Sequence, residues 1–140
     1  MDKKRMSKMM IIAEKALIES SIYDKETGNI TDSYNGLTAG FGVTVAMNGL
    51  LPAIVMYYQD SNASRKTDRR QILDIIGKMI SLDGYKPQGL VQINDATSLL
   101  QAAIADKDGK TTLKREVIDC AVALKQIIRT HNLVKDEESK

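Results

Sequence analysis

Residues 33–59 read SYNGLTAGFGVTVAMNGLLPAIVMYYQ, and none of them carries a charge. Asp32 precedes this run and Asp60 follows it. A long uncharged run first suggests a transmembrane helix, because a helix needs about 20 apolar residues to cross the lipid core. The membrane interpretation therefore has to be weighed against local breaks in the run.

Two breaks favour a soluble hairpin. Asn48-Gly49 is a typical turn pair, and Pro52 is tolerated in the first turn of a helix but not in its interior. The run therefore predicts two helices, roughly Ser33–Met47 and Leu50–Gln59, each too short to span a bilayer. We expect them to form a buried helical hairpin, with a membrane segment as the alternative.

The length, composition and net charge of the chain are typical of one soluble domain. The chain has 140 residues, of which 43% are hydrophobic and 27% charged, and its net charge is +2. Its single cysteine, Cys120, excludes an internal disulfide and fits a reducing compartment. The basic N-terminus is not followed by the apolar core of a signal peptide. We expect a cytoplasmic protein.

Helical periodicity surrounds the hairpin. Helices are predicted at about Asp2–Ser20, from Thr67 or Asp68 to Leu82, from Asn94 or Asp95 to Ala105, and at Thr111–His131. No segment predicts a strand convincingly. The expected fold class is all-α, a compact single-domain bundle of five to six helices built around the central hairpin. Residues 1–133 would form the domain, and 134–140 a charged, disordered tail.

Basic residues gather at three places. Lys4, Lys8 and Lys15 lie opposite the apolar stripe of the first helix, with Ile11 and Ile18 beside them. This row is either a solvated face or a contact surface for a polyanion or a partner chain. The second cluster is Arg65, Lys66, Arg69 and Arg70, before a helix N-terminus, where a bound phosphate would be favourable. Its alternative is a solvated basic loop.

The third place is the last helix. Lys114, Lys125 and Arg129 bracket Ile118 and Val122, which lie outside its apolar arc. An apolar pair with cations around it suits a protein or RNA contact, unless a neighbouring helix of the same domain covers it.

Residues for catalysis are few. The lone histidine, His131, is expected to be a solvent-exposed side chain at the end of the last helix, and with one Cys it cannot complete a usual zinc site. Cys120 is expected in the core. The carboxylates Asp60, Asp74, Asp83 and Glu116 show no paired spacing and are interpreted as surface charges. We expect no enzyme activity, no cofactor, no metal and no small-molecule substrate.

Several motifs together resemble a known family. They are Tyr34-Asn35-Gly36-Leu37, Phe41-Gly42-Val43, Met47-Asn48-Gly49-Leu50-Leu51-Pro52-Ala53, Leu113-Lys114-Arg115-Glu116 and Ala121-Val122-Ala123-Leu124-Lys125. The chain resembles the small subunit of the Cmr complex, the fifth Cmr protein of type III-B CRISPR systems. This resemblance implies a non-catalytic helical bundle, several copies of which stack beside the backbone subunits around the guide RNA paired to its target RNA.

The three basic groups are therefore RNA-binding candidates, and Ile11, Ile18, Ile118 and Val122 are candidates for subunit contacts. We expect as partners other Cmr subunits, especially the backbone subunit and copies of the chain itself, as well as guide and target RNA, but no membrane. The alternative is a helical adaptor or regulatory module that binds only proteins, in which case the basic groups are solvated.

Overall fold

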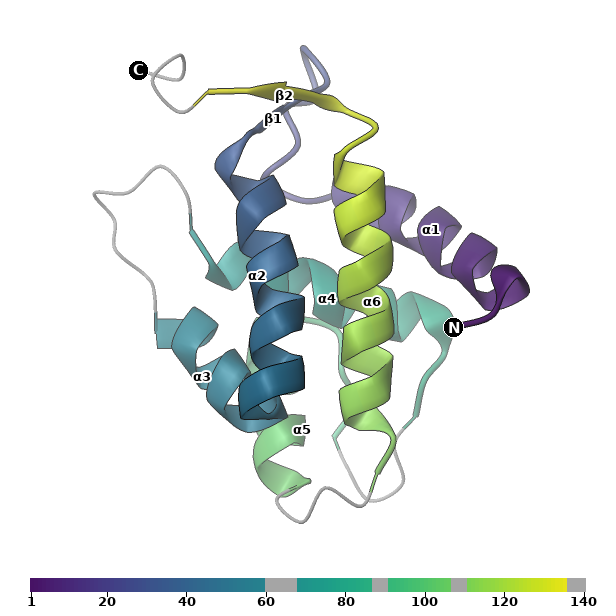
Figure 1. The fold of residues 1–140 in the computed structure, drawn as a ribbon, viewed down its shortest axis with the longest axis vertical. Helices are drawn as coiled ribbons and strands as arrows, with labels where there is room; N and C mark the ends of the chain where they lie inside the picture. Colours follow the sequence, from purple (N-terminus) through teal and green to yellow (C-terminus); the bar gives the residue numbers. More distant parts are fainter. Residues whose placement is uncertain (60–67, 87–90, 107–110, 136–140) are drawn as a thin grey trace.

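The computed structural model describes residues 1–59, 68–86, 91–106 and 111–135. Within these residues the chain forms six α-helices and two short strands (Figure 1). The helices are α1 (Lys3–Ile18), α2 (Ser33–Asn48), α3 (Leu50–Gln59), α4 (Arg70–Asp83), α5 (Ala96–Ala105) and α6 (Leu113–Ile128). The predicted all-α class is confirmed. Asp60, Arg65, Lys66 and residues 136–140 of the predicted tail lie outside the described residues.

The predicted hairpin is present as α2 and α3. The two helices meet at Gly49, whose φ of 98° is strained for any residue with a Cβ. The Gly49 N–H donates to the Val45 carbonyl at 3.0 Å and ends α2. Pro52 lies in the first turn of α3. The Tyr57 hydroxyl donates to the Leu37 carbonyl at 2.7 Å and ties the two helices together.

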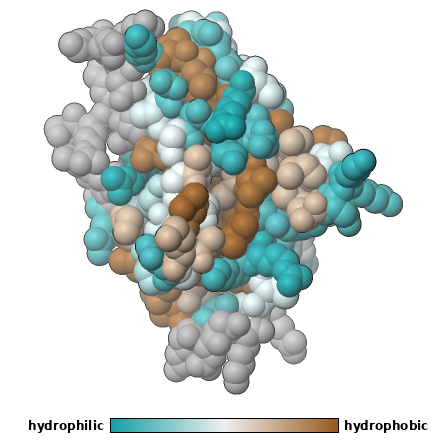
Figure 2. Space-filling view, in the orientation of Figure 1, coloured by the Kyte–Doolittle hydropathy of each residue, from teal (hydrophilic) through white to brown (hydrophobic). Residues whose placement is uncertain are grey.

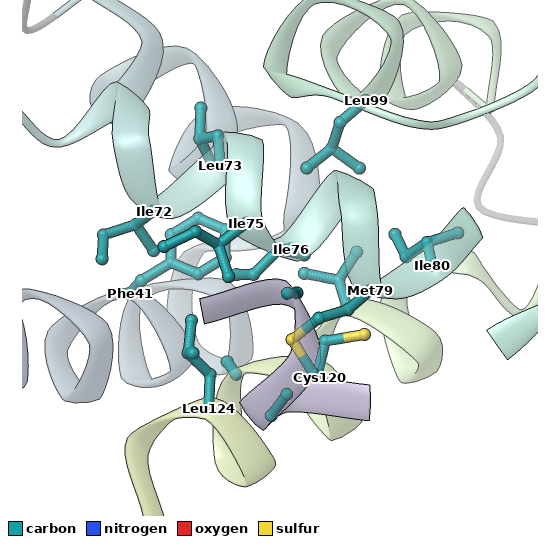
Figure 3. Packing of buried hydrophobic residues seen from close by; sticks show 14 of the residues in the cluster. Phe41, Ile72, Leu73, Ile75, Ile76, Met79, Ile80, Leu99, Cys120 and Leu124 are labelled. Carbon is teal, nitrogen blue, oxygen red and sulfur yellow. The ribbon is translucent and has the colours of Figure 1, made fainter. Parts of the chain in front are cut away.

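Helix α4 lies at the centre of the bundle and packs against each of the other five helices. Its buried residues occupy a wide arc, as expected for a helix covered on several sides. They are Ile72, Leu73, Ile75, Ile76, Gly77, Met79 and Ile80. Figure 3 shows these side chains between Leu99 of α5 and the residues Cys120 and Leu124 of α6. Each large apolar side chain buried there contributes about 1.5–3 kcal/mol.

The start of α5 crosses α4 at Gly77. A Cβ on Gly77 would lie 2.6 Å from the Asp95 carbonyl oxygen, so only glycine permits this approach. Asp95 caps α5 as predicted, since its Oδ1 accepts from the Ser98 N–H at 2.8 Å. Asp74 is a structural residue rather than the predicted free surface charge, because its Oδ1 accepts from the Ala96 N–H at 2.8 Å.

Two strands correct the prediction that the chain has none. The strands β1 (Asn29–Thr31) and β2 (Asn132–Val134) pair in parallel, with Ile30 opposite Leu133. Three residues are too few to show an alternating pattern, and the partners are about a hundred residues apart in the sequence. Val134, the first residue of the predicted tail, belongs to β2, where its carbonyl accepts from the Asp32 N–H at 2.6 Å.

The prediction of a solvent-exposed His131 is wrong. Its side chain is 14% exposed, and its Nε2 lies 2.7 Å from Glu14 Oε1. Its ring meets the Tyr23 ring edge-on, with the ring centroids 5.5 Å apart. Because α6 ends at Ile128, the chain turns and brings His131 back against α1. A contact between residues this far apart leaves no local sequence signal.

The Gly77 contact gives a testable prediction. In a helix, Gly→Ala is normally favourable by about 1 kcal/mol, but the Cβ in Gly77→Ala would clash with the Asp95 backbone. We expect the free energy of unfolding to fall by about 1–3 kcal/mol, measured by urea denaturation. The matched control is Gly36→Ala, because no atom lies within 4 Å of a Cβ at Gly36. Equal stability of the two variants would contradict the proposed close packing of α5 on α4.

Candidate nucleic-acid interface

The basic row of α1 is exposed but not uniform. Lys4 and Lys15 have no ion-pair partner among the described residues. Lys8 is different, because its Nζ lies 2.8 Å from Asp83 Oδ1 at the end of α4. Lys8 is therefore partly neutralised within the molecule, whereas Lys4 and Lys15 have no such acidic neighbour among the described residues.

Arg5, a residue that the sequence did not single out, joins three helices. Its guanidinium donates to Asp119 Oδ2 at 2.8 Å and to Glu116 Oε1 at 2.8 Å, both on α6. It also lies 3.4 Å from Asp83 Oδ2 on α4. We call Arg5, Lys8, Asp83, Glu116 and Asp119 the Arg5 cluster. Because these contacts tie α1 to α4 and α6, the cluster holds the N-terminal helix on the core.

The interpretation of Asp83 and Glu116 as surface charges is wrong. Both side chains are only 6% exposed. One sequence signal was available, since Glu116 stands three residues after Leu113 and four before Cys120, which places it on the buried arc of α6. The identity of its partners could not be read from that spacing.

Burial sets the protonation of this acid pair. Burial, a hydrogen bond with Asp83 and the Asp83 charge together raise the pKa of Glu116 to about 8. Burial also raises the pKa of Asp83, but the hydrogen bond from Glu116 and the charges of Lys8 and Arg5 outweigh it, so the Asp83 pKa lies below its ordinary value. At neutral pH the cations Arg5 and Lys8 therefore balance the anions Asp83 and Asp119, while Glu116 is largely protonated.

A cavity of about 710 Å³ lies beside the cluster, where Arg115 and Thr112 are among its lining residues. Among the described residues, no group of His, Cys, Asp or Glu side chains is arranged to hold a metal ion. Burial raises the pKa of the Cys120 thiol well above its ordinary value, so the thiol stays protonated in the core. Cys120 packs in the core, and the residues of the Arg5 cluster pair their charges with one another.

The arginines at the start of α4 pack against tyrosines. Arg70 donates from Nε and Nη2 to the Tyr58 carbonyl at 3.1 and 2.6 Å, and its guanidinium lies 4.1 Å from the Tyr58 ring centroid. The Arg69 guanidinium lies 5.4 Å from the Tyr57 ring centroid. Both arginines are half-buried. Their visible role is to join the end of α3 to the start of α4 through carbonyl and cation–π contacts.

On α6, the predicted basic and apolar residues form one continuous stripe, which we call the α6 stripe. Lys114 and Arg129 are exposed near its two ends, and Lys125 is half-buried. Arg129 donates to Asn35 Oδ1 at 3.2 Å, and none of the three cations pairs with a carboxylate of the described chain. The stripe also contains Ile118 and Val122.

Ile118 and Val122 are half-buried and line a groove between α6 and α2. The other two candidate contact residues, Ile11 and Ile18, lie on the outer side of α1 and are 72% and 37% exposed.

The three basic groups lie on three helices that pack together. Helix α1 runs along α4, because Lys8 contacts Asp83 at the end of α4 and Ser21, just after α1, donates its hydroxyl to Gln71 Oε1 at the start of α4. Helices α1 and α6 pack against each other (Figure 1). The α1 row and the α6 stripe are therefore on neighbouring helices, and Arg69 and Arg70 lie at the start of α4.

Comparison with known proteins identifies the family. The family model described as CRISPR-associated protein (Cas_Cmr5) matches residues 9–130. No curated protein and no solved structure matches the chain. The chain belongs to the Cas_Cmr5 family and is a subunit of the Cmr complex. This confirms the resemblance seen in its sequence. In the part of the chain that the structure describes, no helix has the length and apolar character needed to span a membrane.

The Arg5 cluster predicts a pH-dependent stability. The pKa of Glu116 is raised in the folded state, so its stabilising effect is complete below its unfolded value of 4.5 and is lost as the pH rises through about 8. We expect the free energy of unfolding to decrease from pH 6 to pH 8, by at most about 1.4 kcal/mol per pH unit for one proton. Urea denaturation of Glu116→Gln should show a flatter dependence.

The control for this measurement is Glu19→Gln, which removes the carboxylate of the exposed Glu19–Lys78 pair. It should leave the slope between pH 6 and pH 8 unchanged. If Glu116→Gln keeps the wild-type slope, Glu116 is not the group that titrates.

Proposed function

We propose that this Cas_Cmr5 family member is a non-catalytic subunit that holds the guide RNA–target RNA duplex through phosphate contacts. Several copies would stack beside the backbone subunits of the Cmr complex, and each copy would present cations to the duplex. The supporting observation is the distribution of paired and unpaired charge on α1 and α6. The internal acids pair with Arg5 and Lys8, while Lys4, Lys15, Lys114 and Lys125 have no acidic partner among the described residues.

This distribution suits recognition of a guided duplex. Base pairing between guide and target reads the sequence, so the protein has to supply only charge and shape. Lysines and arginines that contact phosphates provide affinity independent of sequence, and they release counterions when they bind. An A-form duplex is contacted mainly through its phosphates and 2′-hydroxyls. Unpaired cations on two adjacent helices provide such a surface.

The candidates contribute unequally in this proposal. Lys4 and Lys15 on α1, and Lys114 and Arg129 near the ends of the α6 stripe, are the primary phosphate contacts. Arg65 and Lys66 remain candidates from the sequence, and so does Lys125, which is half-buried in the groove between α6 and α2. Lys8, Arg69 and Arg70 are secondary, because each already makes the internal contacts described above. Substituting them would disturb the packing of α1 or α3 as well as RNA binding, so they are poor positions for a test.

The apolar candidates complete the proposal. Ile11 and Ile18 on α1, and Ile118 and Val122 on α6, would contact neighbouring subunits. Ile11 is 72% exposed, and its burial by a partner would remove a large apolar side chain from water. The same observation favours the second candidate function, a helical adaptor that contacts only proteins. The two functions differ in whether charge reversal changes RNA affinity.

Charge reversal tests the RNA role. Two double variants, Lys4→Glu/Lys15→Glu and Lys114→Glu/Arg129→Glu, would be assembled into the Cmr complex with its guide RNA. We expect weaker binding of target RNA. The slope of log affinity against log salt should also decrease by about one for each cation that no longer neutralises a phosphate. Titrations at several salt concentrations measure both quantities.

Lys25→Glu/Lys86→Glu is the matched control, because it makes the same change in charge at two exposed lysines outside the candidate groups. It should keep the wild-type salt slope. If both test variants assemble normally and keep wild-type affinity and slope, the RNA role is wrong and the adaptor function is favoured.

A further inference from the structure

Charged residues are divided unequally among the helices. Helices α2, α3 and α5 contain no charged residue at all, whereas α1, α4 and α6 all carry charges. Uncharged helices are expected in the interior of an assembly. Only four of the 16 residues of α2 are buried, namely Tyr34, Thr38, Phe41 and Val45. Much of this uncharged helix therefore faces outward.

The outward side of α2 forms one wall of a groove, and α6 forms the other. The walls include Ala39, Val43 and Ala46 of α2 and Ile118 and Val122 of α6. The groove has a volume of about 210 Å³. Figure 2 shows hydrophobic residues, in brown and tan, gathered over α2 and α6 in the centre of this face. Val43 is 57% exposed there. An exposed apolar patch with a polar rim is typical of a protein interaction site.

Small residues make the groove suitable for a helix. Gly42 faces α6, where a Cβ would lie 3.6 Å from the Cβ of Ala121, so the two helices approach closely. Ala39 and Ala46 lie on the same side of α2 and add little bulk. A helix lying along two such helices can place its apolar side chains between them, which is the helix-in-groove mode of recognition.

Charge at the groove restricts its occupant. Lys125 is the charged residue among those that line it, and no carboxylate lines it. Lys114 and Arg129 lie further along the same stripe of α6. An occupant with an acidic residue beside its apolar face would pair with Lys125, whereas Lys114 and Arg129 do not line the groove and stay available to phosphates. A nucleic acid does not fit, because its phosphates would meet mostly apolar side chains.

A second copy that docks through this groove or through the outer side of α1 does not fit either. If two copies joined through this groove, each would bring Lys125 towards the other. The outer side of α1, with Ile11 and Ile18, carries the three lysines of the α1 row and would also meet Lys125 with like charge. The acid beside those isoleucines, Glu14, already contacts His131. Like charges facing each other across an interface disfavour association.

We propose that the α2–α6 groove binds an amphipathic helix of a different protein subunit, one whose apolar face is flanked by acidic residues. This inference rests on the membership of the chain in the Cmr complex, and it assigns the groove, together with Lys125, to a protein partner instead of to RNA. The partner helix covers Val43, Ile118 and Val122 and pairs an acidic side chain with Lys125. The uncharged side of the molecule then faces protein, and the α1 row remains available to RNA.

The test measures binding of the full chain to a Cmr complex assembled with its guide RNA but without this subunit. Val43→Glu and Ala46→Glu each place an acid in the apolar groove at an exposed position. We expect each to weaken binding about tenfold or more, which corresponds to about 1.4 kcal/mol. Lys125→Glu should also weaken binding, because it would repel the acidic flank. Circular dichroism checks that the variants are folded.

Two control variants make the same kinds of substitution at exposed positions outside the groove. Ile104→Glu adds an acid at a 53% exposed apolar position of α5, and Lys25→Glu reverses the charge of an exposed lysine outside the candidate groups. Both should bind the complex as the wild type does.

Three results of the binding measurement would overturn the proposal. They are wild-type binding by both groove variants, an equal loss in Ile104→Glu, and tighter binding by Lys125→Glu. Self-association of the free chain that Val43→Glu abolishes would also overturn it, because the occupant would then be a second copy.

The salt dependence of target RNA binding distinguishes the proposed RNA role from the proposed protein contact. Complexes saturated with Val43→Glu should keep the wild-type salt slope for target RNA, whereas Lys4→Glu/Lys15→Glu should change the slope without losing its place in the complex. Failure of one result therefore leaves the other proposal standing.

Discussion

The burial of α4 is the constraint on which the rest of the structure depends. Its isoleucines fill the centre of the bundle, and Gly77 lets the start of α5 pass directly over it. Its two ends then fix the surroundings, since Arg70 joins it to α3 and Asp83 joins it to α1. Because a close-packed core tolerates little change in volume, the positions of the outer helices, and of the cations on them, follow from this one helix.

Charge pairing then distinguishes structural charges from those left for a partner. A buried carboxylate is costly unless it is paired or protonated. The Arg5 cluster uses both solutions, with two cations balancing Asp83 and Asp119 and with a proton retained on Glu116. The net charge of +2 counted from the sequence does not show which charges are paired inside the molecule. What remains for binding is a smaller set of cations on α1 and α6, without internal acidic partners.

The molecule therefore presents two chemically different surfaces. The α1 row is charged and suited to phosphates, whereas the outward side of α2, with Val43 and Met47 exposed, carries no charge. Nucleic acids bind through electrostatics that salt weakens, while an uncharged helix surface gains free energy by leaving water. The two kinds of surface lie on different helices of one small bundle.

The sequence by itself determined the local features. Asn48-Gly49 and Pro52 divided the uncharged run into two helices, Asp95 marked the start of α5, and helical spacing placed Cys120 in the core. These signals act within a few residues of each other, so they can be read along the chain. Only the tertiary structure decided which distant groups meet: Arg5 with its three carboxylates, His131 with Glu14, and β1 with β2. Such contacts depend on how the helices pack around α4, because packing brings together residues about a hundred positions apart and local spacing does not encode it.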